Sequence, residues 1–296
     1  MKPSKVQPEV LRGYSLGAKE IDVTNNDCIL YALAIGFNRD QLKRDHFKFT
    51  YELEDGFTSF PVMSVATALK GMDGLLDAPG IPEFNPMMLL HGEQRIEINR
   101  PIPPGSRIKA ESKISDVADK RSGAVVTLEV KQTDVKTGEL YTTNYSKIFI
   151  RGIGGFGDKG ILKDPPMPAI PKRTADHVAE EITDKNQALI YRLCGDPNPL
   201  HVDPNMSAMG GFEMPILHGL CSYGFSARAI YEKYCGNDPK RFKAMNARFT
   251  SHVFPGETLV VEMFKEGGQI IFQTKTKERG KAVVVGTVDI APAAKL

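Results

Sequence analysis

The sequence predicts an α+β protein in which an antiparallel sheet wraps around one buried helix, and three observations support this fold class. The residues after His218 would form a helix that is apolar on nearly all sides, and such a helix must be enclosed. The material left to enclose it consists of apolar runs separated by Pro-Gly, Gly-Gly and Arg-Gly turns: 245–254, 257–266, 268–277 and 281–290. The two halves of the chain also look like copies, so each is expected to contribute a sheet.

The duplication is visible as short motifs that recur in the same order. Arg95 to Ile108 and Arg248 to Leu259 each read as a strand, a Pro-Gly turn and a second strand. Two further pairs support the repeat, namely Tyr31 with Gly36 against Tyr191 with Gly195, and Leu90-His91-Gly92 against Leu217-His218-Gly219. The first half has the longer stretch between these motifs, which predicts an insertion that enlarges a pocket.

A segment rich in Gly and Pro separates the copies. It contains GGFG and DPPMPAIP, a composition that does not suit a regular element. We therefore expect an N-terminal repeat at 1–151, a linker at 152–174 and a C-terminal repeat at 175–296. Near the start of the C-terminal repeat, a helix capped by Thr183 is expected to end near Gly195.

The loop after this helix carries the residues best suited to chemistry. Two prolines force the residues before them into extended conformations, so a carboxylate, a carboxamide and an imidazole are held on a stiff loop as Asp196, Asn198 and His201. Preorganised groups of this kind suit acid/base catalysis. The alternative interpretation is that Asp196 and Asn198 form Asx turns and that His201 is a core histidine.

Residues Met214 to Gly219 open the buried helix and offer another functional group. An amide N–H at a helix N-terminus can donate to a developing oxyanion, and the helix dipole reinforces that bond. Gly219 occupies this position. His218 has no expected part in proton transfer and can simply orient the turn or pack. Asp203, directly before Pro204, is assigned to structure as an N-cap.

The composition excludes several classes of function. A formal net charge of +2 gives no basic field for nucleic acid, and the sequence has neither an apolar run long enough to span a membrane nor a signal peptide. It has no GxGxxG or GxxxxGK[ST] loop, and His201 and Asp203 lack further clustered ligands, so we expect no cofactor and no metal. The scattered cysteines are expected to be reduced thiols: Cys28, Cys194, Cys221 and Cys235.

Two segments resemble the signature of the MaoC-like hydratases, especially the hydratase 2 unit of peroxisomal multifunctional enzymes of type 2. They are Tyr191 to His201 and Pro215 to Cys221, and the likeness covers nearly the whole chain, including Met88 to Gln94. The resemblance implies a double hot-dog fold, in which two repeats of one chain take the place of a dimer of single hot-dog subunits. It also implies one active site, because the first repeat has Gly36-Phe37-Asn38-Arg39-Asp40 where the second has its catalytic loop.

The resemblance further implies (3R)-specific hydration of trans-2-enoyl-CoA to (3R)-3-hydroxyacyl-CoA in fatty acid β-oxidation. Asp196 and His201 would position the water, one taking its proton while the other delivers a proton to C2. Asn198 would orient this pair, and the Gly219 N–H would bind the thioester oxygen. The non-catalytic first repeat would accommodate the acyl chain. Four residues would contact the CoA or pantetheine part: His91, Gly92, Lys120 and Phe249. Glu52 matches an acidic position of the family, although a structural ion pair explains it as well.

Several alternatives stay open. One rival function is a 3-hydroxyacyl thioester dehydratase of fatty acid or polyketide synthesis that acts on carrier-protein thioesters. Another is a non-catalytic acyl-CoA-binding hot-dog protein, or a thioesterase. The tail Ala294-Lys295-Leu296 resembles an SKL-type address and predicts a peroxisomal location. The acyl-chain range, the assembly (with a homodimer as one alternative) and membership of a longer multifunctional enzyme are also open.

Overall fold

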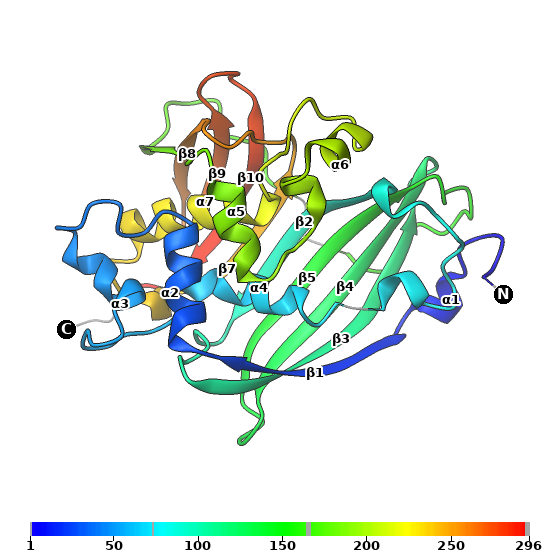
Figure 1. Ribbon diagram of the computed structural model, residues 1–296, viewed down its shortest axis with the longest axis horizontal. Coiled ribbons are helices and arrows are strands. Elements are labelled where there is room, and N and C mark those ends of the chain that lie inside the picture. The colour runs from blue at the N-terminus through cyan, green and yellow to red at the C-terminus, as the bar shows by residue number, and fades with distance from the viewer. Residues whose placement is uncertain (1, 73, 164–166, 294–296) are drawn as a thin grey trace.

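A ten-stranded antiparallel sheet forms the frame of the protein. The computed structural model describes residues 2–72, 74–163 and 167–293. The strands follow the order β1-β3-β4-β5-β2-β7-β10-β9-β8-β6, so each half supplies five strands in the same relative order. In Figure 1 the first set crosses the lower right and β8, β9 and β10 stand at the top. The prediction of two repeats, each with an antiparallel sheet, is confirmed.

The strands of both repeats are rich in β-branched residues and alternate between buried and exposed positions, as strands with one covered face do. Their bounds are β1 Ser15–Val23, β2 Leu89–Ile98, β3 Ser106–Asp119, β4 Gly123–Asp134, β5 Leu140–Arg151, β6 His177–Ile182, β7 Phe242–Phe249, β8 Thr258–Glu266, β9 Gln269–Thr276 and β10 Ala282–Ile290. The four strands expected in the second half are therefore present.

The helices are short, with one exception. The α-helices are α1 Pro8–Leu11, α2 Asn25–Ala34, α3 Phe47–Thr50, α4 Ser64–Leu69, α5 Gln187–Tyr191, α6 Pro204–Met209 and α7 Gly219–Tyr234. The 3-10 turns are η1 Arg44–His46, η2 Pro61–Met63, η3 Leu75–Asp77, η4 Pro86–Met88, η5 Arg192–Cys194, η6 Pro199–His201 and η7 Pro239–Arg241.

Helix α7 is the buried helix that the sequence predicts. Every residue from Leu220 to Tyr231 is buried, and α7 packs against β7, β8 and β10. Gly224 lets the helix approach the first half closely, because a Cβ at this position would lie 2.4 Å from the side chain of Ile35. The helix is therefore enclosed by both halves, as an apolar helix must be.

The two halves meet at the seam between β2 and β7. Glu93 of β2 pairs with Arg248 of β7 in the ladder, and its carboxylate also accepts from Arg248 and from Lys147 at 2.8 and 2.6 Å. The duplicated tyrosines Tyr31 and Tyr191 also meet, with ring centroids 6.1 Å apart. The halves thus share one continuous sheet and one core.

Two local predictions are wrong. Thr183 does not cap a helix: it donates to the Glu257 carbonyl at 2.9 Å, and α5 begins only at Gln187. Thr183 is drawn instead into the turn before β8, where its hydroxyl also accepts from the Gly256 amide. A single Thr before an apolar run does not fix a helix start, because tertiary partners compete for its hydroxyl.

The second error concerns the Leu-His-Gly pair. His91 lies within β2, whereas His218 is the N-cap residue of α7. The true counterpart of α7 in the first half is α4, which the Pro-led turn η2 precedes. A three-residue match is too short to fix an alignment, so the insertion inferred from it loses its basis.

The remaining local predictions fare better. Asp203 caps α6 by accepting from the Asn205 amide at 2.8 Å, and Pro204 stands at the first helical position. All four cysteines are free thiols. Residues 152–163 and 167–174 contain no helix or strand, although the repeat boundaries stay a prediction. Within the part of the chain that the structure describes, no helix has the length and apolar character to cross a membrane.

Candidate active site

A cavity of about 930 Å³ lies between the two repeats and brings most of the predicted site residues together. The first repeat lines it with apolar side chains, which are Leu69, Met72, Leu75, Leu76, Leu89, Leu90, Leu128, Ile148 and Phe149. The second repeat adds polar and aromatic groups, among them Asp196, Asn198, His201, Gly219 and Phe249. The cavity is therefore largely apolar, with a few polar groups that come mostly from the second repeat, which is typical of small-molecule sites.

The loop that carries Asp196 is held by its own side chains. The Asp196 carboxylate accepts from the Asn198 amide at 3.2 Å, and the Asn198 side-chain oxygen accepts from the Leu200 amide at 3.0 Å. These are the Asx-turn bonds of the alternative interpretation, yet both residues also line the cavity. The turn bonds fix the loop and leave acceptor capacity for a ligand, so the catalytic interpretation is compatible with the Asx turns and stays a prediction.

His201 has a defined tautomer. Its Nδ1 lies 2.8 Å from the Ile216 carbonyl oxygen, and a carbonyl oxygen only accepts, so Nδ1 carries the proton. In the neutral ring, Nε2 then carries the lone pair and can accept a proton. Burial lowers the pKa of His201 below its usual range, against the opposing effects of the Ile216 bond and the charge of Asp196. His201 is thus neutral near pH 7.

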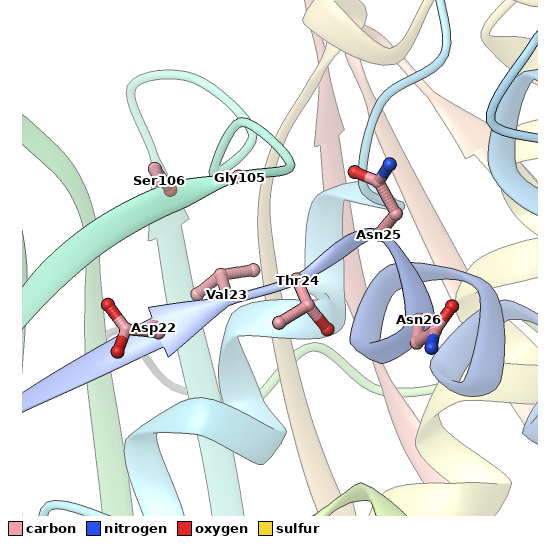
Figure 2. Close-up of a pocket in the computed structure, with 7 residues that line it drawn as sticks. All are labelled: Asp22, Val23, Thr24, Asn25, Asn26, Gly105 and Ser106. Atoms are coloured by element: carbon pink, nitrogen blue, oxygen red, sulfur yellow. The ribbon is translucent and has the colours of Figure 1, made fainter.

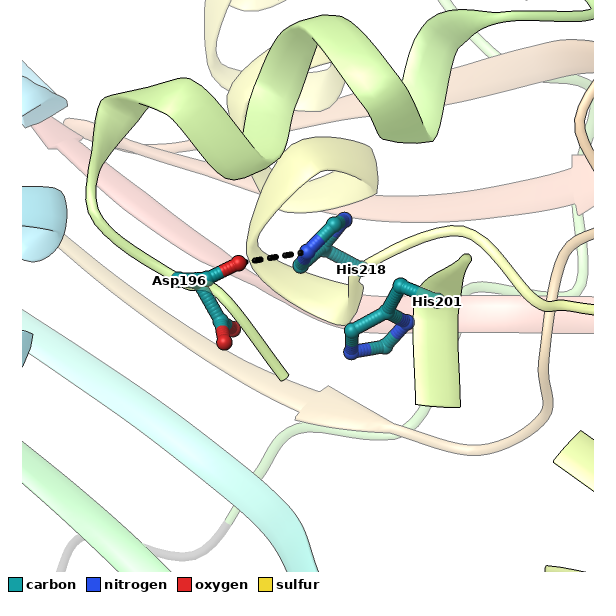
Figure 3. Close-up of side chains that lie close together, drawn as sticks. All are labelled: Asp196, His201 and His218. Carbon is teal, nitrogen blue, oxygen red and sulfur yellow. Dashed lines mark hydrogen bonds between the residues drawn. The ribbon is translucent and has the colours of Figure 1, made fainter. Parts of the chain in front are cut away.

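His218 contacts both Asp196 and His201. Its Nε2 donates to the Asp196 carbonyl oxygen at 3.2 Å, and its ring stacks on that of His201 with centroids 3.7 Å apart at 29° (Figure 3). Burial and the neighbouring His201 lower the pKa of His218 to about 2. The stack gives the two imidazoles nearly parallel planes, so the site holds two neutral rings face to face.

Asp196, His201 and His218 also form the only described group of three residues that could hold a metal ion, with ligand atoms within 4.8 Å of one another. The geometry fits a metal poorly. Imidazole lone pairs lie in the ring plane, and two stacked rings cannot both aim at one ion. Nδ1 of His201 and Nε2 of His218 each donate to a carbonyl oxygen, which metal-bound histidines also do with their second nitrogen, so only the stacking of the rings disfavours a metal.

Gly219 is the first residue of α7 and lines the cavity. The first N–H groups of a helix have no partner within it, so this amide can donate to a ligand oxygen. A side chain here would be crowded, because a Cβ would lie 3.2 Å from the ring of Phe249. The glycine therefore lets Phe249 and the helix terminus approach each other at the cavity wall.

On the opposite wall His91 is anchored by a buried amide chain. Its Nε2 lies 3.1 Å from the Gln94 side-chain oxygen, and the Gln94 amide nitrogen donates to Asn144 and to the Arg95 carbonyl. Gln94 is 1% exposed, so this orientation is fixed and His91 must donate. Burial lowers the pKa of His91 to about 4. The ring packs edge-on against Phe249 at 5.2 Å, and Gly92 lines the cavity beside it.

Lys120 is not brought to the cavity. It lies exposed in the turn between β3 and β4, where its amide donates to the Gly123 carbonyl. Glu52 is likewise exposed and outside the lining. Sequence reasoning missed Arg151 and His252, which do line the cavity. A lone arginine at a strand end and a lone histidine in a connection give no local signal of a site, so only the fold reveals them.

A second pocket of about 440 Å³ lies where β1 ends and α2 begins (Figure 2). Two of its polar groups have structural partners: the Thr24 hydroxyl accepts from the Asp27 amide as part of a capping box, and the Gly105 amide donates to the Val23 carbonyl. Local turn chemistry explains this hollow, so the cavity between the repeats is the candidate active site.

Comparisons with known proteins agree with this geometry. Residues 21–152 match the family described as MFE-2 hydratase 2 N-terminal domain, and residues 167–287 match the MaoC like domain. A probable enoyl-CoA hydratase 2 of Dictyostelium discoideum is 43% identical over 92% of each chain. The chain belongs to the MaoC-like hydratase family.

Other proteins similar to this MaoC-like chain are either longer or of nearly the same length. Peroxisomal multifunctional enzyme type 2 of Mus musculus is 42% identical over 95% of this chain, which spans only 38% of that protein. The 3-hydroxyacyl-thioester dehydratase Y of Mycobacterium tuberculosis is 36% identical over 85% of this chain and 86% of its own length. A MaoC-like dehydratase structure from Phytophthora capsici superposes with a TM-score of 0.87 and 35% identity, covering 98% and 99% of the two chains. The predicted double hot-dog fold is confirmed.

Proposed function

We propose that this protein hydrates trans-2-enoyl-CoA to (3R)-3-hydroxyacyl-CoA in fatty acid β-oxidation. The observation that carries the proposal is the presence of Asp196, His201 and the Gly219 amide in the lining of one cavity. Relatives named enoyl-CoA hydratase 2 and peroxisomal multifunctional enzyme type 2, at 43% and 42% identity, support the substrate class.

The chemistry follows from the protonation states. The neutral Nε2 of His201 takes a proton from water, whose oxygen adds to C3, while the Asp196 carboxylate orients that water. The Asp196–His201 pair returns one proton to C2, so both hydrogens and the oxygen of water are accounted for. The backbone N–H of Asn198 holds the Asp196 carboxylate through the loop bond at 3.2 Å, and the Asn198 side chain is proposed to orient the Asp196–His201 pair. General acid/base groups of this kind contribute roughly 10² to 10⁴ in rate.

The Gly219 amide supplies the second contribution. As water adds to C3, negative charge moves onto the thioester oxygen, and a preorganised N–H at a helix terminus stabilises that charge. One such donor is worth on the order of 10² to 10³ in kcat. His91, Gly92 and Phe249 line the cavity and are proposed to hold the thioester arm. Lys120 is proposed only for the distal CoA part, outside the cavity.

The first repeat supplies room for the acyl chain. Its wall is formed by aliphatic and aromatic side chains from α4, η3, β2, β4 and β5. Burial of apolar surface stabilises a ligand by about 0.8 kcal/mol per CH₂. We therefore propose a preference for medium or long chains over four-carbon substrates, with the first repeat in a non-catalytic role.

The test is the loss of enoyl absorbance with trans-2-decenoyl-CoA, followed by chiral analysis of the product. The wild type is expected to give the R product, and Asp196→Asn to lower kcat by at least about 10². Asp203→Asn is the matched control, because Asp203 caps α6 and is assigned no chemistry. An S product, or full activity in Asp196→Asn, contradicts the proposal.

A second candidate is favoured by one relative, the 3-hydroxyacyl-thioester dehydratase Y, at 36% identity. The same residues would then run the reaction toward the enoyl thioester on a carrier protein. Parallel assays with CoA and carrier-protein thioesters separate the two, since turnover of carrier-bound substrate alone would favour the dehydratase. Release of free thiol, measured with Ellman's reagent, would instead identify a thioesterase.

We also propose a peroxisomal location, which the names of the relatives support. The tail Ala294-Lys295-Leu296 lies outside the described residues and stays a prediction. A fluorescent fusion that leaves the tail free should colocalise with a peroxisomal marker. The homodimer likewise stays a proposal, and sedimentation measures it directly.

A further inference from the structure

A buried histidine contacts all the parts of the proposed machinery without a step assigned to it. His218 is 1% exposed. It bonds the backbone of Asp196, stacks on His201 and directly precedes Gly219 (Figure 3). One side chain therefore connects the loop that carries the carboxylate, the ring that serves as base and the helix terminus that offers the oxyanion donor.

The protonation of His218 excludes it as a proton carrier. Because Nε2 donates to a carbonyl oxygen, Nδ1 carries the lone pair of the neutral ring. This Nδ1 is buried without a hydrogen-bond partner. A second cation stacked on His201 would be repelled when His201 takes up its proton. His218 can thus lie against a ring that becomes charged only because it stays neutral itself.

The other ionisable groups around the two rings are few. Arg192 and Tyr191 come from the α5–η5 segment, Asp196 from the loop, and His91 and His252 from across the cavity. Arg192 disfavours a charge on His218, whereas Asp196 favours a charge on His201. When one of the two rings takes up a proton, the surroundings therefore favour His201 as the charged ring.

We propose that His218 is a positioning residue whose neutral imidazole ties the Asp196 loop to the start of α7 and covers one face of His201. The inference rests on the proposed hydratase function. Without the bond, the loop and the helix terminus would be free to shift relative to each other. Misplacement of reacting groups by about 1 Å can cost on the order of 10²-fold in rate.

Two variants separate the bond from the ring. His218→Gln keeps an N–H donor near the position of Nε2 but removes the stacked ring, whereas His218→Phe keeps a ring and removes the donor. We expect His218→Phe to lower kcat about tenfold to hundredfold, with KM for trans-2-decenoyl-CoA within about threefold and an unchanged pH profile. In His218→Gln water reaches the open face of His201, so its pKa rises and the acid limb of kcat/KM moves to higher pH, because burial is the main cause of its lowered pKa.

An NMR titration measures the pKa of the His201 ring without any need for turnover. The signals of this ring are identified by their absence in His201→Gln. If the wild type hydrates no enoyl-CoA, the function proposal fails while the titration still decides the role of His218. If both variants keep wild-type kcat and an unchanged His201 titration, and only Tm falls, His218 is purely structural and the inference is overturned. Should one variant not fold, the other together with the titration decides.

Discussion

The loop after α5 and the loop after α2 occupy equivalent places in the two repeats but have opposite contents. In the second repeat Asp196 follows the loop glycine and faces the cavity. In the first repeat Phe37 follows Gly36 and is buried, with its ring about 5.0 Å from those of Phe49 and Phe60. An aromatic cluster thus fills the place where a second cavity would have opened.

The charged groups near the first loop lie in ion pairs with one another. Arg228 of α7 is 2% exposed and pairs with Glu181 and Glu232 at 2.7 and 2.9 Å. The His46 ring accepts from the Asn38 amide and lies 3.1 Å from Glu232. The two repeats thus contain two equivalent places. The place in the second repeat has polar side chains that line a cavity, whereas the place in the first repeat, called the closed site below, is filled by aromatic rings and ion pairs.

The largest expected effect is a loss of stability when the ion pairs of Arg228 in the closed site are removed. Arg228→Leu leaves Glu181 without its cation, whereas Glu232 keeps Lys43 at 2.8 Å. The free energy of unfolding should fall by up to about 3–5 kcal/mol, as measured by urea denaturation. The double variant Arg228→Leu/Glu181→Leu should recover part of this loss, since the carboxylate that has lost its cation is removed as well. Activity per folded molecule should persist. A loss below about 1 kcal/mol would mean that the ion pairs do not hold the closed site together.

The next effect tests the helix-terminal N–H of Gly219, a feature of the candidate active site. Gly219→Pro removes the N–H at the first helical position, where proline is tolerated, and Gly219→Ala is its matched control, because it adds a Cβ against Phe249 but keeps the donor. We expect kcat of the proline variant to lie a further 10² to 10³ below that of the alanine variant. Equal kcat values in the two variants would remove the oxyanion role of Gly219.

A smaller effect tests the first repeat as a wall. Leu128 is fully buried and lines the cavity from β4, so Leu128→Phe should shorten the apolar chamber. kcat/KM with trans-2-decenoyl-CoA is expected to fall about tenfold, a difference typical of one misfitting apolar group. Turnover of the four-carbon substrate, the internal control, should hardly change. An equal loss on both substrates would show that this wall does not sense chain length.

The smallest expected effect is a shift in pH dependence. The pKa of His201 lies below its usual value of about 6.5 because of burial, and the neutral form is the proposed base. The acid limb of kcat/KM should therefore have its midpoint below about pH 6.5, with activity lost as the pH falls through that value. A midpoint above pH 6.5 would assign the limb to another group.

Sequence patterns predicted the parts of the fold and site that depend on local chemistry. The apolar helix after His218, the four strands of the second half and the cap at Asp203 are all present. The placement of Thr183 and the alignment of His91 with His218 were wrong. Both errors concern residues whose partners come from far along the chain, such as Glu257 for Thr183.

By itself the sequence determined the stiff loop that holds Asp196, Asn198 and His201, because proline restraints and Asx bonds act over a few residues. Only the tertiary structure decided that His218 stacks on His201, that Gln94 orients His91 and that Phe37 closes the equivalent place. These contacts depend on how two five-stranded halves join at one seam. No local preference specifies that packing, since it follows from burying the shared apolar helix and strands together.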